Sequence, residues 1–134
     1  MSLPLAVEDI SGAQELFDWF GYWPDFHDAE VLKVHIELGT ESSLLLHTWE
    51  MTNKITPEGF YELRKHVSVE FVLDEVTSLN VQDLWEHSIL LSLVISKTAA
   101  GFLLELSSAY GLCGTIAAQN ISLRLKSGKP FVSS

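Results

Sequence analysis

Residues 30–38, EVLKVHIEL, decide the fold, because apolar and polar side chains alternate along them. Apolar residues stand at every second position from Leu32 to Leu38, the period expected of a strand with one buried and one wetter face. A Gly-Thr-Glu-Ser turn follows at residues 39–42, and residues 43–51 are predicted to return as a second strand. Strands joined by so short a link pair antiparallel.

Four more strands are predicted further along the chain, at residues 67–74, 88–96, 102–108 and 120–126. A single helix is predicted over residues 11–20, with Ser11 and Gln14 placed for a capping box and Gly21 placed to end it. The expected architecture is α+β, a single antiparallel β-sheet of about six strands with one N-terminal helix packed against it. We expect one domain over residues 1–134, with an ordered core at about 7–126 and a flexible tail at 127–134.

The predicted strand at residues 88–96 is apolar on both faces, which indicates that both faces are covered. A ten-residue helix is about 15 Å long and cannot cover a six-stranded sheet. The remaining surface is therefore covered by the loop at residues 52–66 and the C-terminal tail, or by another chain such as a second copy.

Charge is distributed unevenly along the 134 residues, whose net charge is -10. Residues 1–50 carry ten acidic side chains and one basic one, Lys33. Such a surface repels nucleic acid, which binds through basic groups that displace counterions. It either attracts a basic protein or serves solubility alone, with no partner implied. The candidate partner-binding residues are the acids of this half and one aromatic: Glu8, Asp9, Glu15, Asp18, Trp23, Asp25 and Asp28.

No apolar run reaches the roughly 18 residues needed to cross a bilayer, and the N-terminus has no basic flank before an apolar stretch. The single Cys113 has no intrachain disulfide partner, which fits a reducing compartment. We therefore expect a cytoplasmic protein without membrane contact.

Aromatic and ionisable residues are densest at residues 20–30, FGYWPDFHDAE. One hypothesis is that His27, Asp28 and Glu30 ligate a metal or act as a general base, with His35 and His47 from neighbouring strands joining them. These spacings match no metal-binding or hydrolase motif.

The other interpretation of this segment is structural. Asp25 or Asp28 bonds free backbone N–H groups of the turn, while Trp23 and Phe26 plug the open end of the sheet. This interpretation is the better supported, so we expect no catalytic residues, metal or cofactor.

Two further histidines and one tryptophan have weaker patterns. His66 and His87 stand at predicted strand entrances, where solvated or capping roles are expected. Trp85 is a core or interface anchor. Gly111 and Gly114 indicate a bend between strands.

Residues 20–30 and the late segment YGLCG at 110–114 resemble the bacterial immunity protein 50 family. The Glu50-Met51 pair and residues 63–66, LRKH, are also similar to it. Members are predicted α+β proteins with a Trp-Pro motif, encoded beside polymorphic toxins. The resemblance implies inhibition of a toxin by direct binding, and it supplies no catalytic residues.

The leading prediction is therefore a non-enzymatic binding protein whose partner is a basic protein toxin. The first alternative is a small metal-dependent or acid–base enzyme centred on His27, Asp28 and Glu30. The second is a homodimeric ligand-binding module that uses the second apolar face of the sheet.

Overall fold

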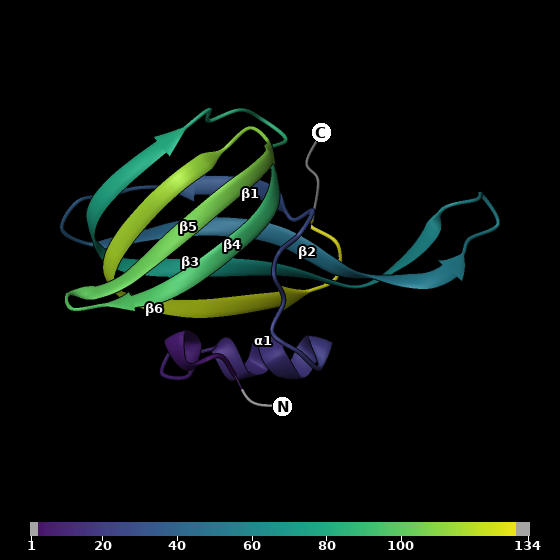
Figure 1. The fold of residues 1–134 in the computed structure, drawn as a ribbon, viewed down its shortest axis with the longest axis horizontal. Helices are drawn as coiled ribbons and strands as arrows, with labels where there is room; N and C mark the ends of the chain where they lie inside the picture. Colours follow the sequence, from purple (N-terminus) through teal and green to yellow (C-terminus); the bar gives the residue numbers. More distant parts are fainter. Residues whose placement is uncertain (1–2, 131–134) are drawn as a thin grey trace.

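The computed structural model of the chain describes residues 3–130. One antiparallel sheet of six strands dominates it, and a short N-terminal layer consists of a 3-10 turn η1 (Leu5–Val7) and a helix α1 (Ala13–Phe20) (Figure 1). The strands are β1 (Glu30–His35), β2 (Glu41–Ile55), β3 (Tyr61–Gln82), β4 (Ile89–Thr98), β5 (Gly101–Tyr110) and β6 (Cys113–Ser127). The predicted α+β class, six strands and N-terminal helix are thus confirmed.

The sheet closes on itself in the order β1-β2-β3-β6-β5-β4. Most neighbours share long ladders, but β1 meets β4 through one residue pair, Glu30 with Ile89. Residues 25–31 close the sheet at this seam with backbone hydrogen bonds such as Asp28 N–H to Leu90 O at 2.9 Å. Alternation along a strand cannot reveal which two edges meet.

The interior of the closed sheet holds the apolar core, with fully buried side chains such as Leu44, Phe71 and Leu104. Outside it, α1 turns its apolar face, Leu16 and Phe20 included, toward this core. The layer is tied to β6 by a hydrogen bond from Leu123 N–H to Ser11 O at 2.7 Å. Closure gives each strand one inward face, which the alternating pattern fills.

The beginning of α1 differs from the prediction, whereas its end agrees with it. Gly12, in the left-handed conformation, is the N-cap, and no side chain caps the helix, so the capping box of Ser11 and Gln14 is wrong. Ser11 instead forms a bridge to Ser122 of β6, which takes its backbone into the sheet. Gly21 adopts the left-handed conformation and donates its N–H to Phe17 O at 2.7 Å, as predicted.

The expected loop at residues 52–66 is a second correction, because β2 and β3 continue through it as a hairpin. It therefore does not cover the sheet, and Leu91 and Val94 stay half exposed on the outer face of β4. The predicted tail begins within β6, which extends to Ser127, and residues 131–134 lie outside the described part. None of the helices in the described residues is long and apolar enough to span a membrane.

Candidate functional site

The acids of the N-terminal layer are all exposed. Glu8 and Asp9 follow η1, and Glu15 and Asp18 lie on the outer side of α1. Asp9 Oδ2 accepts a hydrogen bond from Lys97 Nζ at 2.7 Å, which raises the pKa of that lysine. This surface is thus available to a partner, with one of its charges already paired.

The Trp-Pro segment forms a plug in the core. Phe26 is fully buried with its ring centroid 5.5 Å from that of Phe71, and Trp23 packs edge-on against it at 6.2 Å. Asp25 Oδ1 accepts the His27 N–H at 2.9 Å, the turn-forming bond expected of a short acidic side chain. The contacts agree with the structural interpretation of this segment, and Trp23 is only partly exposed.

The proposed metal group is not brought together. His27 Nδ1 lies 3.2 Å from Asp28 Oδ2 on the surface, whereas Glu30 turns to His47. His35 instead faces Glu37, with Nε2 3.9 Å from Oε2. Across residues 3–130, no group of three or more side chains is placed to hold a metal ion.

Glu30, His47 and His66 form a hydrogen-bonded chain on the outer face of β1, β2 and β3. His47 Nδ1 lies 3.1 Å from Glu30 Oε1, and His47 Nε2 lies 2.9 Å from His66 Nδ1. Because the carboxylate can only accept, His47 donates from Nδ1 to Glu30. The direction of the bond between His47 Nε2 and His66 Nδ1 is set by the tautomers of the two rings.

Burial affects the protonation of His66. His47 is 5% exposed, and its ring stacks on that of His66 at 5.1 Å. Burial lowers the pKa of His66, with further lowering from His47 and Lys129. A cavity of about 280 Å³ lies beside the two rings, lined also by Trp49 and Leu63. His66 is thus half-buried and hydrogen-bonded to His47, a partner that its position at a predicted strand entrance did not indicate.

Residues 50–64 form a projecting arm, in which β2 and β3 pair only with each other (Figure 1). Met51 stands opposite Leu63, and Ile55 stands opposite Tyr61. Since Tyr61 and Leu63 are two residues apart, these four side chains share one face of the hairpin. The exposed fraction is 56% for Met51, 43% for Leu63, 60% for Ile55 and 56% for Tyr61. We call these four residues the arm face; they form an apolar strip that the described chain leaves uncovered.

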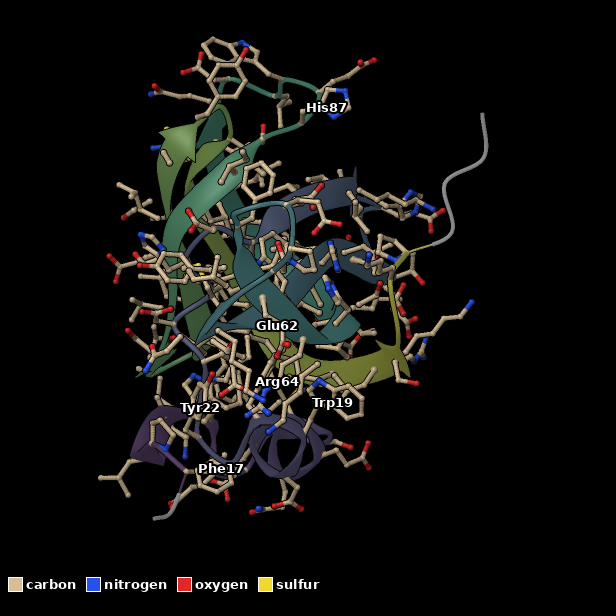
Figure 2. The ribbon with its side chains drawn as sticks, turned by 90° about the vertical axis from the view of Figure 1, so that its right-hand side faces the viewer. Phe17, Trp19, Tyr22, Glu62, Arg64 and His87 are labelled. Atoms are coloured by element: carbon tan, nitrogen blue, oxygen red, sulfur yellow. The ribbon has the colours of Figure 1, made fainter. Side chains whose placement is uncertain are left out.

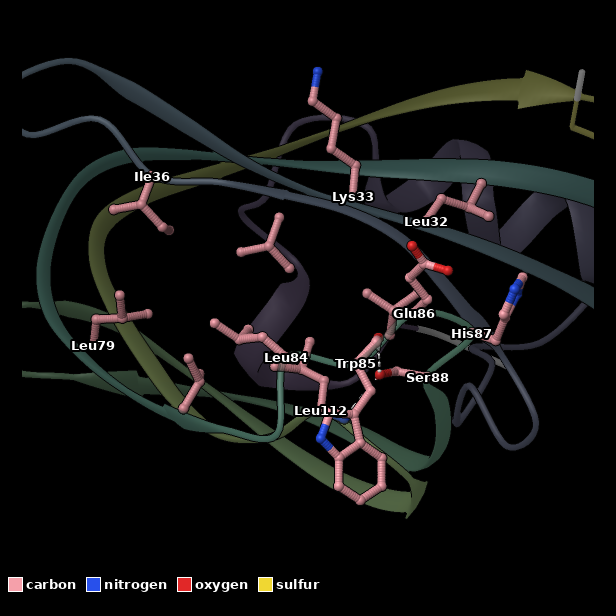
Figure 3. Close-up of a pocket in the computed structure, with 13 residues that line it drawn as sticks. Leu32, Lys33, Ile36, Leu79, Leu84, Trp85, Glu86, His87, Ser88 and Leu112 are labelled. Atoms are coloured by element: carbon pink, nitrogen blue, oxygen red, sulfur yellow. Dashed lines mark hydrogen bonds between the residues drawn. The ribbon is translucent and has the colours of Figure 1, made fainter. Parts of the chain in front are cut away.

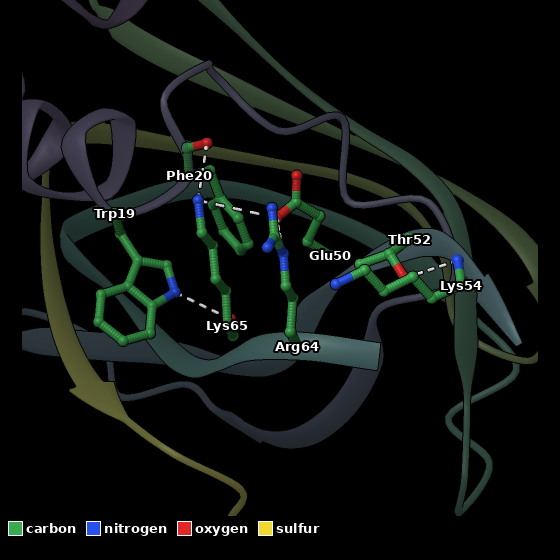
Figure 4. Close-up of polar contacts among 7 residues, drawn as sticks. All are labelled: Trp19, Phe20, Glu50, Thr52, Lys54, Arg64 and Lys65. Atoms are coloured by element: carbon green, nitrogen blue, oxygen red, sulfur yellow. Dashed lines mark hydrogen bonds and ion pairs between the residues drawn. The ribbon is translucent and has the colours of Figure 1, made fainter. Parts of the chain in front are cut away.

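Polar contacts hold the root of the arm against α1 (Figure 4). Trp19 Nε1 donates to Lys65 O at 2.8 Å, and Lys65 Nζ donates to Phe20 O at 3.5 Å. Within the arm root, Arg64 Nε donates to Glu50 Oε2 at 2.9 Å and joins the two strands. Figure 2 places Arg64, Trp19 and Tyr22 together beside the helix, with His87 at the opposite end. Burial, and then the charge of Glu50, raise the pKa of Tyr22. The direction of the arm is thus fixed by the helix layer.

A second cavity, of about 650 Å³, lies between β1 and residues 79–88 (Figure 3). We call it the slot. Its walls are mainly apolar, and Ile36 faces Leu79 and Leu84 across it. Trp85, predicted as a core or interface anchor, is about half exposed at its rim and packs on Tyr110 with ring centroids 5.2 Å apart.

Comparison with known families identifies the chain. The sequence model of immunity protein 50 matches residues 12–127. The chain belongs to the immunity protein 50 family. The match covers α1, all six strands and the arm, so the predicted resemblance is confirmed over nearly the whole fold. Searches of curated proteins and of solved structures find no match.

Sequence analysis missed two features of this immunity protein 50 family member, the arm and the partners of His66. A signal for the arm was present, because Tyr61 and Leu63 alternate with Glu62 and Arg64, and a Pro-Glu-Gly turn precedes them. His66 comes after Lys65, which has a positive φ of 55° within β3. That irregularity breaks the alternation, so no periodic pattern could place His66 beside His47.

Proposed function

We propose that this protein neutralises a cognate bacterial toxin by direct protein–protein contact, without catalysis, and that the arm face is the centre of that contact. The observation that carries the proposal is the exposure of Met51, Ile55, Tyr61 and Leu63 on one side of an unsupported hairpin. Contiguous exposed apolar side chains of this kind mark interaction sites. The family match supplies the class of partner.

The arm is suited to a partner because little else in the chain needs its apolar side chains. An isolated two-stranded hairpin is marginally stable in water and gains from a covering surface. Leu63 also lines the cavity beside His47, His66 and Trp49, so the arm face continues into an aromatic recess at its root. Aromatic anchors at the centre of an apolar patch are the usual energetic centres of protein interfaces.

The acidic layer has a separate role in the proposal, which is to attract a basic toxin. A net charge of -10, with ten acids in residues 1–50, accelerates the encounter with a basic protein through long-range attraction. The exposed residues Glu8, Glu15 and Asp18, together with Asp25 and Asp28, supply much of this field. Trp23 contributes by holding the Trp-Pro segment in place. The lone Cys113 fits action in the cytoplasm, a reducing compartment.

Co-expression with a candidate cognate toxin tests the proposal. We expect the protein to restore growth and to form a complex with the purified toxin, measured by titration calorimetry. The association rate should fall when salt is added, because screened charges steer less. Neutralising Glu8, Glu15 and Asp18 as Gln, Gln and Asn should slow association and leave dissociation nearly unchanged. Rescue of growth without a detectable complex would contradict direct contact.

A further inference from the structure

Strand β1 continues past the end of its neighbour β4. The two strands share the single pair Glu30 with Ile89, and beyond it the register of β1 has partners only in β2. The position that a continuing neighbour would take is occupied by the slot, whose lining includes Val34 and Trp85. Beyond Glu30, one edge of β1 therefore has no neighbouring strand among the described residues.

The pairing register shows which backbone groups of β1 face the slot. Val31 donates its N–H to Ser88 O, and Leu90 donates to Ala29 O, so the groups of Glu30 between them point to β2. The register shifts by one residue between Val31 and Lys33, so Lys33 and His35 stand opposite Leu45 and Ser43. These partners lie two and four residues from His47, the partner of Glu30, so Lys33 and His35 repeat the orientation of Glu30. Val34 lies between them, and its N–H and C=O face the slot.

The slot has the size and lining that an added strand needs. Its volume of about 650 Å³ falls in the range of about 300–1,000 Å³ found for ligand pockets in proteins. Apolar side chains from both sides, such as Ile36 and Leu84, line the space (Figure 3). Unpaired strand edges bind extended peptides through main-chain hydrogen bonds, and adjacent pockets select alternate side chains.

We propose that the slot accepts an extended segment of a partner protein as an added strand along β1, with alternate apolar side chains in the slot and basic side chains outside. This inference rests on the proposed function in assigning the segment to the toxin. The basic character follows from the net charge of -10 of the whole chain, whereas in the lining Lys33 and Glu86 contribute one charge of each sign. The unpaired edge at Val34 distinguishes a peptide from a compact apolar ligand, which would leave these backbone groups unused.

Peptide titration tests the strand pairing itself. The probe is the acetylated and amidated peptide Lys-Val-Lys-Val-Lys-Val, followed by amide NMR of the labelled protein. We expect saturable shifts at Lys33, Val34 and Ile36 and slower hydrogen exchange at Val34. Two further peptides are N-methylated, one on every Val and the other on every Lys. Since alternate N–H groups face opposite edges of a strand, only one of these should bind more weakly, by about tenfold for each hydrogen bond lost.

A matched pair of variants separates backbone pairing from apolar contact. Val34→Pro removes the N–H on the open edge, where proline is tolerated, and Val34→Ala keeps it. After thermal unfolding has shown that both variants fold, Val34→Pro should bind the probe about tenfold more weakly than Val34→Ala. Equal affinity of the two variants, equal loss for both methylated peptides, or no saturable binding overturns the inference.

The toxin itself separates this inference from the proposed function. If the wild-type protein binds the toxin and Val34→Pro binds it equally well, the slot is not the contact and the proposed function stands. If the wild-type protein binds no toxin, the proposed function fails, and the peptide titration alone decides whether the slot takes a strand. Loss of toxin affinity in Val34→Pro, with the arm face intact, is the result that we expect.

Discussion

Replacing Met51 and Leu63 by Ser should weaken toxin binding strongly while leaving the fold intact. The two side chains lie opposite each other on the arm face and are 56% and 43% exposed, so a partner that covers them buries about one whole side chain. Full burial of one such side chain is worth about 1.5–3 kcal/mol. The expected loss is therefore about ten- to 150-fold in Kd.

The stability of the protein alone should change much less. Met51 and Leu63 lie where only two strands pair, outside the closed sheet and its core. A single cross-strand pair contributes about 0.2–1 kcal/mol, so the free energy of unfolding should fall by no more than about 1 kcal/mol. The matched control is the double variant Thr52→Ser and Glu62→Ser, which changes the neighbouring positions on the opposite face of the hairpin.

Titration calorimetry with the purified toxin measures the affinity, urea unfolding measures the stability, and light scattering tests self-association. The control variant should bind like the wild type. If Met51→Ser with Leu63→Ser binds the toxin with unchanged Kd, the arm face is not the contact. If the wild-type protein alone is a dimer and the variant is a monomer, the arm face instead joins two copies.

Three further changes test the surroundings of the site. Burial and His47 lower the pKa of His66, so protein stability is highest above the ordinary value of 6.5 and falls as the pH drops below it. His66→Gln should flatten this decline in urea unfolding curves recorded on both sides of that pH. Phe26→Ala removes a fully buried ring that packs against Phe71, so the free energy of unfolding should fall by about 3–5 kcal/mol in the same assay. A decrease below about 1 kcal/mol would mean that the Trp-Pro segment does not plug the core. Trp19→Phe keeps an aromatic ring but removes the hydrogen bond to Lys65 O. It should lower the free energy of unfolding by about 1 kcal/mol and speed amide exchange in the arm. An unchanged exchange rate would show that α1 does not hold the root of the arm.

The structure also sharpens the roles of the ionisable residues near the Trp-Pro segment. His27, Asp28 and Glu30 are close in sequence, yet Glu30 enters β1 and bonds His47 across the strand pair. His27 and Asp28 remain in the turn before the strand, where Asp28 has a positive φ of 67°. Closeness in sequence therefore predicted a cluster that the change from turn to strand separates.

The sequence by itself determined the class of fold, the position of the helix and the central part of every strand, because local alternation and turn residues are properties of a few neighbouring side chains. It also determined the excess of acids and the family. Only the tertiary structure decided that the sheet closes, that the arm stands free, that His66 meets His47 and that β1 keeps an open edge. Each of these depends on which distant strands become neighbours, and that choice is made by long-range packing and register, which no local pattern records.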